Sequence, residues 1–168
     1  MSAPSGRAVR PTPARVKEAL FSILGQRIDG ARVLDLFAGS GALGFEALSR
    51  GAAHVTFVES HRRTAEALTR TARALALVDR AMVIAAPAER VAARLAGRYD
   101  IVFADPPFAL PYPAALFGQL RASGALDAQT LVVYEHSSAN VAPDDARFAL
   151  LRTARYGAVA LSFLKAAA

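Results

Sequence analysis

Near the middle of the chain lies a segment whose residue types could hold a planar amine, Asp105-Pro106-Pro107-Phe108. It follows the apolar run Ile101–Ala104, and its prolines make a stiff turn because proline fixes φ and has no backbone N–H. The polar groups of such a turn are carbonyl oxygens and one carboxylate, which can accept the hydrogens of an exocyclic NH2 group, while the aromatic ring can stack on a base. Proline turns after buried strands are common, so a structural turn explains this segment equally well when it is taken alone.

A second segment that could do chemistry is the glycine-rich stretch after the first predicted strand. Residues 39–44 match G-x-G-x-x-G, in which glycines let the backbone approach a ligand, and Glu59 ends the next predicted strand. Asp35 stands at the end of the first strand, facing the ligand crevice, where a carboxylate would repel a pyrophosphate. It would attract the ammonium and sulfonium groups of S-adenosylmethionine, and Glu59 could accept hydrogen bonds from ribose hydroxyls. A methyl donor is therefore favoured over a nicotinamide cofactor, and over a merely tight strand-to-helix turn. The predicted cofactor-binding residues are Asp35, Phe37, Ala38, Gly39, Ser40, Gly41, Glu59, Ser60 and Ala86.

Hydrophobic periodicity predicts the elements that position these segments. A helix is expected over 13–25, after which short apolar runs alternate with helical stretches. Strands are expected at 33–37, 55–59, 82–85, 101–104, 131–135, 147–153 and 158–164, with helices at 42–50, 62–77, 88–95 and 112–122. This pattern is typical of an α/β, doubly wound, Rossmann-like fold: a mostly parallel seven-stranded sheet covered on both faces, with a C-terminal antiparallel hairpin. We expect one domain over 1–168, made of an N-terminal arm (1–12), a helix (13–25) and an α/β core (32–168).

The predicted topology brings the candidate residues to one place. In an open parallel sheet, ligands bind beyond the carboxyl ends of the strands, near the point where the strand order reverses. Asp35, Glu59 and Asp105 each close a predicted strand at that edge. One crevice could therefore hold a methyl donor against an amine.

Composition and charge narrow the class of protein. The 168 residues carry a net charge of +6, and of the 20 basic residues only Lys17 and Lys165 are lysines, so the others are arginines, which grip phosphate with a planar fork. Nucleic acid is thus a plausible partner, although arginines that are simply solvated would give the same charge.

The absence of cysteine and the separation of the three histidines argue against a bound metal. No stretch is apolar over the roughly 20 residues of a membrane span, and Met1–Val9 lacks the apolar segment of a signal peptide, so a soluble cytoplasmic protein is expected.

With these residues in view, the chain resembles the RsmD family of bacterial rRNA methyltransferases. The resemblance covers nearly the whole chain and is carried by three segments: 10–21, which contains Arg-Pro-Thr followed by Arg-Val-Lys-Glu-Ala-Leu-Phe, 33–44, and 100–108. The first is the most specific, because methyltransferases in general share the other two. The resemblance implies transfer of a methyl group from S-adenosylmethionine to N2 of a guanine in 16S rRNA, guanine 966, with free rRNA or the small ribosomal subunit as substrate. From the composition we expect no metal and no membrane, and we expect a monomer.

The resemblance also implies roles for single residues. Asp105, Pro106, Pro107 and Phe108 would be catalytic, and Arg7, Arg10, Thr12 and Arg15 would contact nucleic acid. The chain departs from the family in two places. Only Met1–Val9 precedes Arg10, where relatives usually carry a basic hairpin, and residues 85–88 are Ala-Ala-Pro-Ala where the family often has Asn-Ala or Asp-Ala near the adenine. Recognition of adenine would then depend on backbone groups and apolar packing.

A mechanism follows as a hypothesis. If the Asp105 carboxylate and the Pro106 carbonyl each accept one N–H of the guanine amine, its nitrogen becomes pyramidal and its lone pair can attack the methyl group. The base must first leave its stack, and Phe108 would hold it. Three alternatives stay open: an N6-adenine or other amino methyltransferase acting on DNA or RNA, a nicotinamide-dependent oxidoreductase, and an RNA-binding assembly factor without catalysis.

Overall fold

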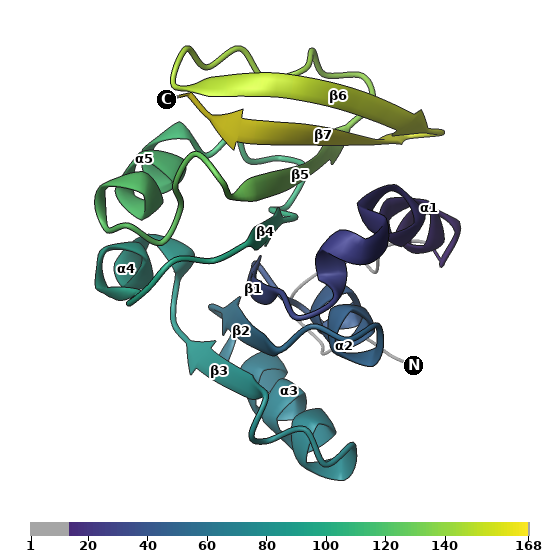
Figure 1. Cartoon of the computed structure of the whole chain (residues 1–168), viewed down its shortest axis with the longest axis vertical. Helices are drawn as coiled ribbons and strands as arrows, with labels where there is room; N and C mark the ends of the chain where they lie inside the picture. The colour runs from purple at the N-terminus through teal and green to yellow at the C-terminus, as the bar shows by residue number, and fades with distance from the viewer. Residues whose placement is uncertain (1–13, 168) are drawn as a thin grey trace.

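The computed structural model describes residues 14–167, which form a seven-stranded sheet in the order β3-β2-β1-β4-β5-β7-β6, flanked by helices (Figure 1). The strands are β1 (Arg32–Leu36), β2 (His54–Glu59), β3 (Ala81–Ala85), β4 (Ile101–Ala104), β5 (Leu131–Ser137), β6 (Phe148–Tyr156) and β7 (Val159–Ala166). The helices are α1 (Ala14–Leu24), α2 (Ala42–Ser49), α3 (Arg62–Ala74), α4 (Ala88–Val91) and α5 (Ala114–Ala122), with the 3-10 turns η1 (Gly25–Ile28) and η2 (Ala92–Arg94). Each predicted strand and helix is present within a few residues of its expected bounds, which confirms the Rossmann-like α/β prediction.

Both faces of the sheet are covered, as a parallel sheet requires. In Figure 1, α1, α2 and α3 lie on one side of the sheet and α4 and α5 on the other. Side chains alternate between these two layers: Val33 and Phe103 pack with α1 and α2, whereas Val102 packs with α4 and α5. This two-sided burial explains why the strands read as continuous apolar runs in the sequence.

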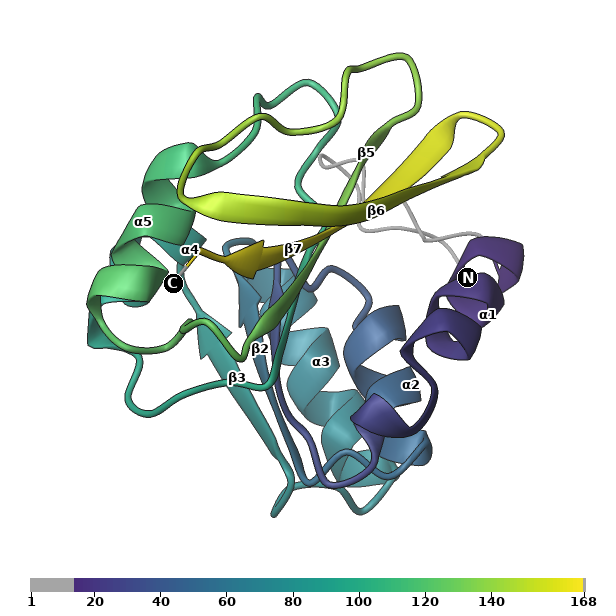
Figure 2. The ribbon, with the colours of Figure 1, turned by 45° about the horizontal axis from the view of Figure 1, so that its top comes forward.

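Of the last two strands, only β7 reverses direction relative to the parallel sheet. β7 runs antiparallel to both β5 and β6 and lies between them, with Ser137 of β5 opposite Val159 of β7. The turn between β6 and β7 therefore lies at the edge where β5 ends. Figure 2 shows this turn near α1, and Arg15 reaches to 3.7 Å from the point where a Cβ on Gly157 would stand. The predicted hairpin is confirmed, and its turn stands on the side of the sheet where the candidate residues are expected.

Candidate active site

The candidate site lies at the carboxyl ends of four parallel strands, where one residue from each strand or from the loop after it stands at the same level. In the register, Leu36 of β1 pairs with Val58 of β2 and with Ala104 of β4, and Ala104 pairs with Tyr134 of β5. The next residue of each strand is therefore, in spatial order, Glu59, Phe37, Asp105 and Glu135. The strand order reverses between β1 and β4, so this row crosses the switch point at which open α/β sheets bind ligands.

The glycine loop between β1 and α2 is held in place by a carboxylate from β2. Glu59 is buried, and its Oε1 accepts a hydrogen bond from the backbone N–H of Gly39 at 3.0 Å while Oε2 accepts one from His61 at 2.6 Å. Glu59 thus fixes both the glycine loop and the turn that leads into α3. Gly41 has φ of +80°, and a Cβ there would stand 2.6 Å from side-chain atoms of Leu68 and Phe45. The loop thus needs glycine for both its conformation and its packing.

Asp35 lies beneath this loop. Only 2% of the residue is exposed, its Oδ2 accepts a hydrogen bond from the backbone N–H of Gly44 at 3.1 Å, and the pocket described below is lined by other residues. Burial raises the pKa of the Asp35 carboxyl well above its ordinary value, the Gly44 N–H opposes this shift, and nearby Glu59 adds to it. Asp35 therefore supports the glycine loop from beneath, through its hydrogen bond to the first turn of α2.

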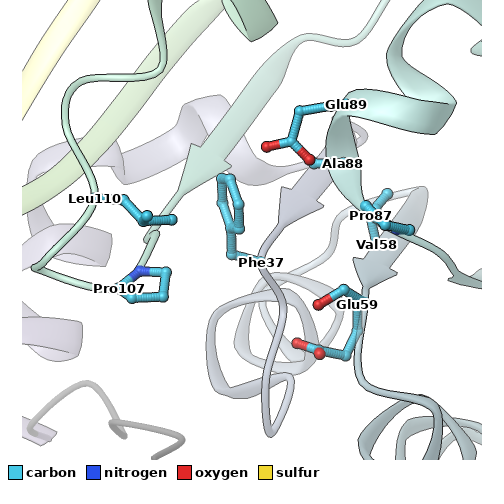
Figure 3. A pocket seen from close by; sticks show the side chains of 9 residues that line it. Phe37, Val58, Glu59, Pro87, Ala88, Glu89, Pro107 and Leu110 are labelled. Atoms are coloured by element: carbon cyan, nitrogen blue, oxygen red, sulfur yellow. The ribbon is translucent and has the colours of Figure 1, made fainter.

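A pocket lies between the ends of β1, β2 and β4 and the start of α4. It holds about 470 Å³ of empty space, part of which is open solvent. Its lining residues are Phe37, Val58, Glu59, Ser60, Pro87, Ala88, Glu89, Pro107 and Leu110 (Figure 3). Apolar walls with one buried carboxylate at the end of β2 can take a nucleoside, whose ring is flat and whose ribose carries two hydroxyls.

Of the predicted cofactor residues, the pocket brings Phe37, Glu59 and Ser60 together. The predicted residues Ala38, Gly39, Ser40, Gly41 and Ala86 lie beside it in the glycine loop and after β3. The sequence analysis did not predict five of the lining residues: Val58, Pro87, Ala88, Glu89 and Leu110. Their signal was weak, because Val58 is an ordinary strand residue, residues 87–89 only begin a short helix, and Leu110 stands in a loop. In Figure 3, Glu89 extends from α4 on the side of the pocket that faces Phe37.

The Asp-Pro-Pro-Phe turn forms the opposite wall. Pro106 is buried, Asp105 and Phe108 are partly buried, and Pro107 faces the pocket. Leu110 donates its backbone N–H to the Pro107 carbonyl at 2.9 Å, which closes the turn. Phe108 packs against the core layer that includes α1. The four predicted catalytic residues thus stand at the end of β4, next to the cofactor-sized pocket.

Behind this turn lies a second, narrower cavity with about 170 Å³ of empty space, too tight in this structure to admit a water molecule. Its lining consists of Pro106, Pro107, Phe108, Leu110, Tyr134, Glu135, His136, Ser137 and Asn140. Pro107 and Leu110 therefore belong to both cavities and separate them. The Asp-Pro-Pro-Phe turn stands between a cofactor-sized pocket and a slot at the end of β5.

His136 has a structural role in this second cavity. Its Nε2 lies 2.8 Å from the hydroxyl of Ser162, its Nδ1 lies 3.0 Å from the carbonyl of Ser137, and its ring stacks on Tyr134 with 5.0 Å between centroids. Burial lowers the pKa of His136, so the neutral imidazole is favoured. With Nδ1–H donating to Ser137, Nε2 accepts from Ser162, which ties β5 to β7.

The loop after β5 is fastened to the loop before α5. The Tyr112 hydroxyl donates to Asp145 at 3.1 Å, and Arg147 donates to the same carboxylate at 2.8 Å and to the Ala114 carbonyl at 2.8 Å. The Arg147 guanidinium is the main cause that lowers the pKa of Asp145 to about 2. Tyr112 therefore anchors the segment that follows the Asp-Pro-Pro-Phe turn.

Among the nucleic-acid residues predicted from the sequence, Arg7, Arg10 and Thr12 lie outside the described residues. Arg15 is exposed on α1 near the β6–β7 turn. Arg155 of β6 is also exposed and donates to the Ser138 carbonyl at 2.8 Å, just beyond the end of β5. Two arginines thus flank the site edge within residues 14–167. In that same range, no His, Asp and Glu side chains group as metal ligands do, and no helix has the length and apolar character to cross a membrane.

A seven-stranded sheet with these pockets at its switch point defines a Rossmann-like methyltransferase fold, and comparison with solved structures agrees. A structure titled "Putative methyltransferase yhhF from Escherichia coli" superimposes with a TM-score of 0.84 at 34% identity, covering 99% of this chain and 91% of that one. The family model described as "Conserved hypothetical protein 95" matches residues 1–165. The chain belongs to this family, the RsmD family, so the resemblance seen in the sequence is confirmed.

Curated relatives carry methyltransferase names. "Ribosomal RNA small subunit methyltransferase D" of Escherichia coli strain K12 is 36% identical over 140 residues, which cover 83% of this chain and 70% of that protein. "Putative rRNA methyltransferase YlbH" of Bacillus subtilis strain 168 is 34% identical over 139 residues, which cover 81% of this chain and 76% of that protein. The chain is thus a member of a methyltransferase family, and the prediction of an enzyme of this class is confirmed at that level.

Proposed function

We propose that this protein transfers a methyl group from S-adenosylmethionine to the exocyclic N2 of a guanine in 16S rRNA, guanine 966 by family resemblance. The observation that carries the proposal is the position of Asp105. It follows β4, which neighbours β1, at the level where the glycine loop begins, and the adjoining turn separates a nucleoside-sized pocket from a second cavity. A methyl donor and an amine acceptor can meet across such a turn.

The residues present suit S-adenosylmethionine. Glu59 presents a carboxylate at the end of β2 that can accept hydrogen bonds from ribose hydroxyls, and the apolar residues Val58, Pro87 and Leu110 provide walls for the adenine. A Cβ added at Gly44 would stand 2.2 Å from the Phe57 ring, so glycine there lets α2 pack closely on the sheet, as the third glycine of a nucleotide-binding loop does. Asp35, at the inner end, is the acceptor for the ammonium group. When bound, the cofactor supplies an electrophilic methyl group on a sulfonium.

The chain's own residues then act on the base. The Asp105 carboxylate and the Pro106 carbonyl accept the two amine hydrogens and orient the N2 lone pair toward the methyl group. The N–CH3 bond forms as the S–CH3 bond breaks, and the positive charge that develops on N2 is stabilised by Asp105. The amine proton leaves to Asp105 or to water. Phe108 holds the extruded ring, and pocket walls such as Pro107 exclude solvent from the methyl group.

RNA would approach from the edge that carries the site. Arg15 and Arg155 lie there, and Arg7, Arg10 and Thr12 precede α1 in the chain. We include a cytoplasmic location and a monomeric state in the proposal, since the family resemblance and the site on a single chain support both.

The test is methyl transfer from tritiated S-adenosylmethionine to naked 16S rRNA, to small subunits and to DNA, followed by mapping of the labelled nucleotide. Label on N2 of one guanine in rRNA is the expected result, whereas label on adenine N6 or in DNA would overturn the proposal. Asp105→Ala should abolish transfer while S-adenosylmethionine binding, measured by isothermal titration, changes by only a few fold. The control is Asp79→Ala, which removes an exposed carboxylate from the turn before β3 at the opposite edge of the sheet. Preferential binding of NAD in the same titration would indicate an oxidoreductase.

A further inference from the structure

The end of β5 places a second carboxylate beside Asp105. The register pairs Phe103 with Val133 and Ala104 with Tyr134, so the next pair across β4 and β5 is Asp105 and Glu135. Asp105 precedes proline and is therefore held in an extended conformation, which continues the alternation of the strand. Both side chains then project to the face on which Phe103 and Val133 pack, from strands about 4.8 Å apart.

Glu135 belongs to a rigid part of the site. It pairs with Leu161 of β7, the preceding Tyr134 pairs with Ala104 of β4, and only 2% of Glu135 is exposed. It lines the narrow cavity together with Pro106 and Phe108. A base that presents its amine to Asp105 and the Pro106 carbonyl, and its ring to Phe108, would present the adjoining ring nitrogen to Glu135.

The hydrogen-bonding edge of the base decides whether this contact is favourable. Guanine carries N1–H next to its 2-amino group, so its edge is made of donors. Adenine carries a lone pair on N1 next to its 6-amino group. An ionised carboxylate is acceptor-only, and two carboxylates side by side favour a ligand that offers hydrogens to both. Glu135 would therefore attract the N1–H of guanine and repel the N1 lone pair of adenine.

From this geometry we propose that Glu135 is a specificity-determining residue that selects guanine by accepting a hydrogen bond from N1–H. The inference rests on the proposed function and adds to it, since the Asp-Pro-Pro-Phe turn accommodates any exocyclic amine. A buried hydrogen-bond acceptor that is placed to meet a hydrogen-bond donor discriminates strongly against an analogue that lacks this donor. This discrimination is much stronger than that of an apolar pocket against a ligand of a different size.

The experiment separates the N1–H from the amine that is methylated. A synthetic segment ligated into full-length 16S rRNA carries guanine, 2,6-diaminopurine or 2-aminopurine at the labelled position. Both analogues keep the 2-amino group but have a lone pair at N1. We expect the wild-type protein to prefer guanine over each analogue by at least about a hundredfold in kcat/KM. In Glu135→Gln, whose amide can either accept from N1–H or donate to an N1 lone pair, the preference should shrink to within about tenfold.

The control Glu66→Gln makes the same change on the exposed face of α3, where Glu66 pairs with Arg62, and should keep the wild-type preference. Each preference is the ratio of kcat/KM for guanine to kcat/KM for one analogue, measured on the same enzyme. Partial misfolding of a variant therefore does not alter it. Thermal unfolding and titration with S-adenosylhomocysteine verify that Glu135→Gln is folded.

Two results would overturn the assignment of Glu135. The first is that the wild-type protein methylates the analogues as fast as guanine, a measurement that needs no variant. The second is that the Glu135→Gln protein keeps the full preference for guanine. Absence of transfer from the wild-type protein to any guanine would instead refute the proposed function.

Discussion

Replacing Asp35 by asparagine should stabilise the protein and weaken the cofactor at the same time. Asparagine keeps the size of the side chain and an oxygen for the Gly44 N–H, which Asp35 Oδ2 accepts at 3.1 Å. It removes a carboxylate that is 2% exposed. Because burial raises its pKa in the folded protein, Asp35 contributes stability below about pH 3.8, and that contribution is lost as the pH rises through the folded pKa. At neutral pH, Asp35→Asn removes the cost of the buried charge.

The effect on binding has the opposite sign. A hydrogen bond between charged groups is worth about 1.5–3 kcal/mol, so losing the contact with the cofactor ammonium should weaken binding about 10- to 150-fold. The ammonium favours the ionised form of Asp35. Wild-type affinity for S-adenosylhomocysteine should therefore rise with pH above about 4, and Asp35→Asn should flatten this dependence.

The assays are thermal unfolding and isothermal titration. The titrations use S-adenosylhomocysteine and 5′-methylthioadenosine, which shares the adenosine but lacks the amino acid portion, so its affinity should be the same for wild type and variant. Asp79→Asn serves as an exposed control. A variant that is less stable than wild type at pH 7 would refute the electrostatic reasoning. Equal weakening of both ligands would show that Asp35 only supports the loop.

Three further predictions concern packing, RNA contact and pH. Gly44→Ala forces a Cβ to within 2.2 Å of an aromatic ring in β2 and should lower the free energy of unfolding by about 1–3 kcal/mol, measured by urea denaturation; an unchanged midpoint would contradict the close packing. Arg155→Ala should reduce the slope of log K against log salt for rRNA binding by about 0.7–0.9 if it contacts one phosphate, whereas Arg73→Ala on the outer face of α3 should leave the slope unchanged. The ion pair between Asp145 and Arg147 should stabilise the protein above about pH 4 and lose this effect as the pH falls toward 2, so the acid unfolding curve of Asp145→Asn should be flatter there.

The sequence predicted the parts of the fold and site that depend on local pattern. Runs such as 101–104 are apolar at every position because both faces of the sheet are buried, and the residue after such a strand stands at the ligand edge whatever the rest of the chain does. Glu59 was recognised in this way, and the structure places it under the glycine loop with Gly39 as its hydrogen-bond donor.

Features that depend on contacts between distant segments could not be predicted. Nothing local in residues 148–166 says that β7 enters between β5 and β6, because the pairing partner of a strand is set by the whole sheet. The sequence predicted that Asp35 faces the crevice. It could not predict that this carboxylate is buried and accepts a hydrogen bond from the backbone of Gly44. Glu135 was visible as a strand end, but its place beside Asp105 follows only from the neighbouring positions of β4 and β5.

Pro107 and Leu110 line both the nucleoside-sized pocket and the narrower cavity at the end of β5. A partition shared by two compartments makes their occupancies interdependent, since a ligand that presses on one side alters the shape of the other. If binding of the donor changes the affinity for the base by some factor, binding of the base must change the affinity for the donor by the same factor. Under the proposed function, the strength of this coupling would depend on the stiffness of a single proline-rich turn.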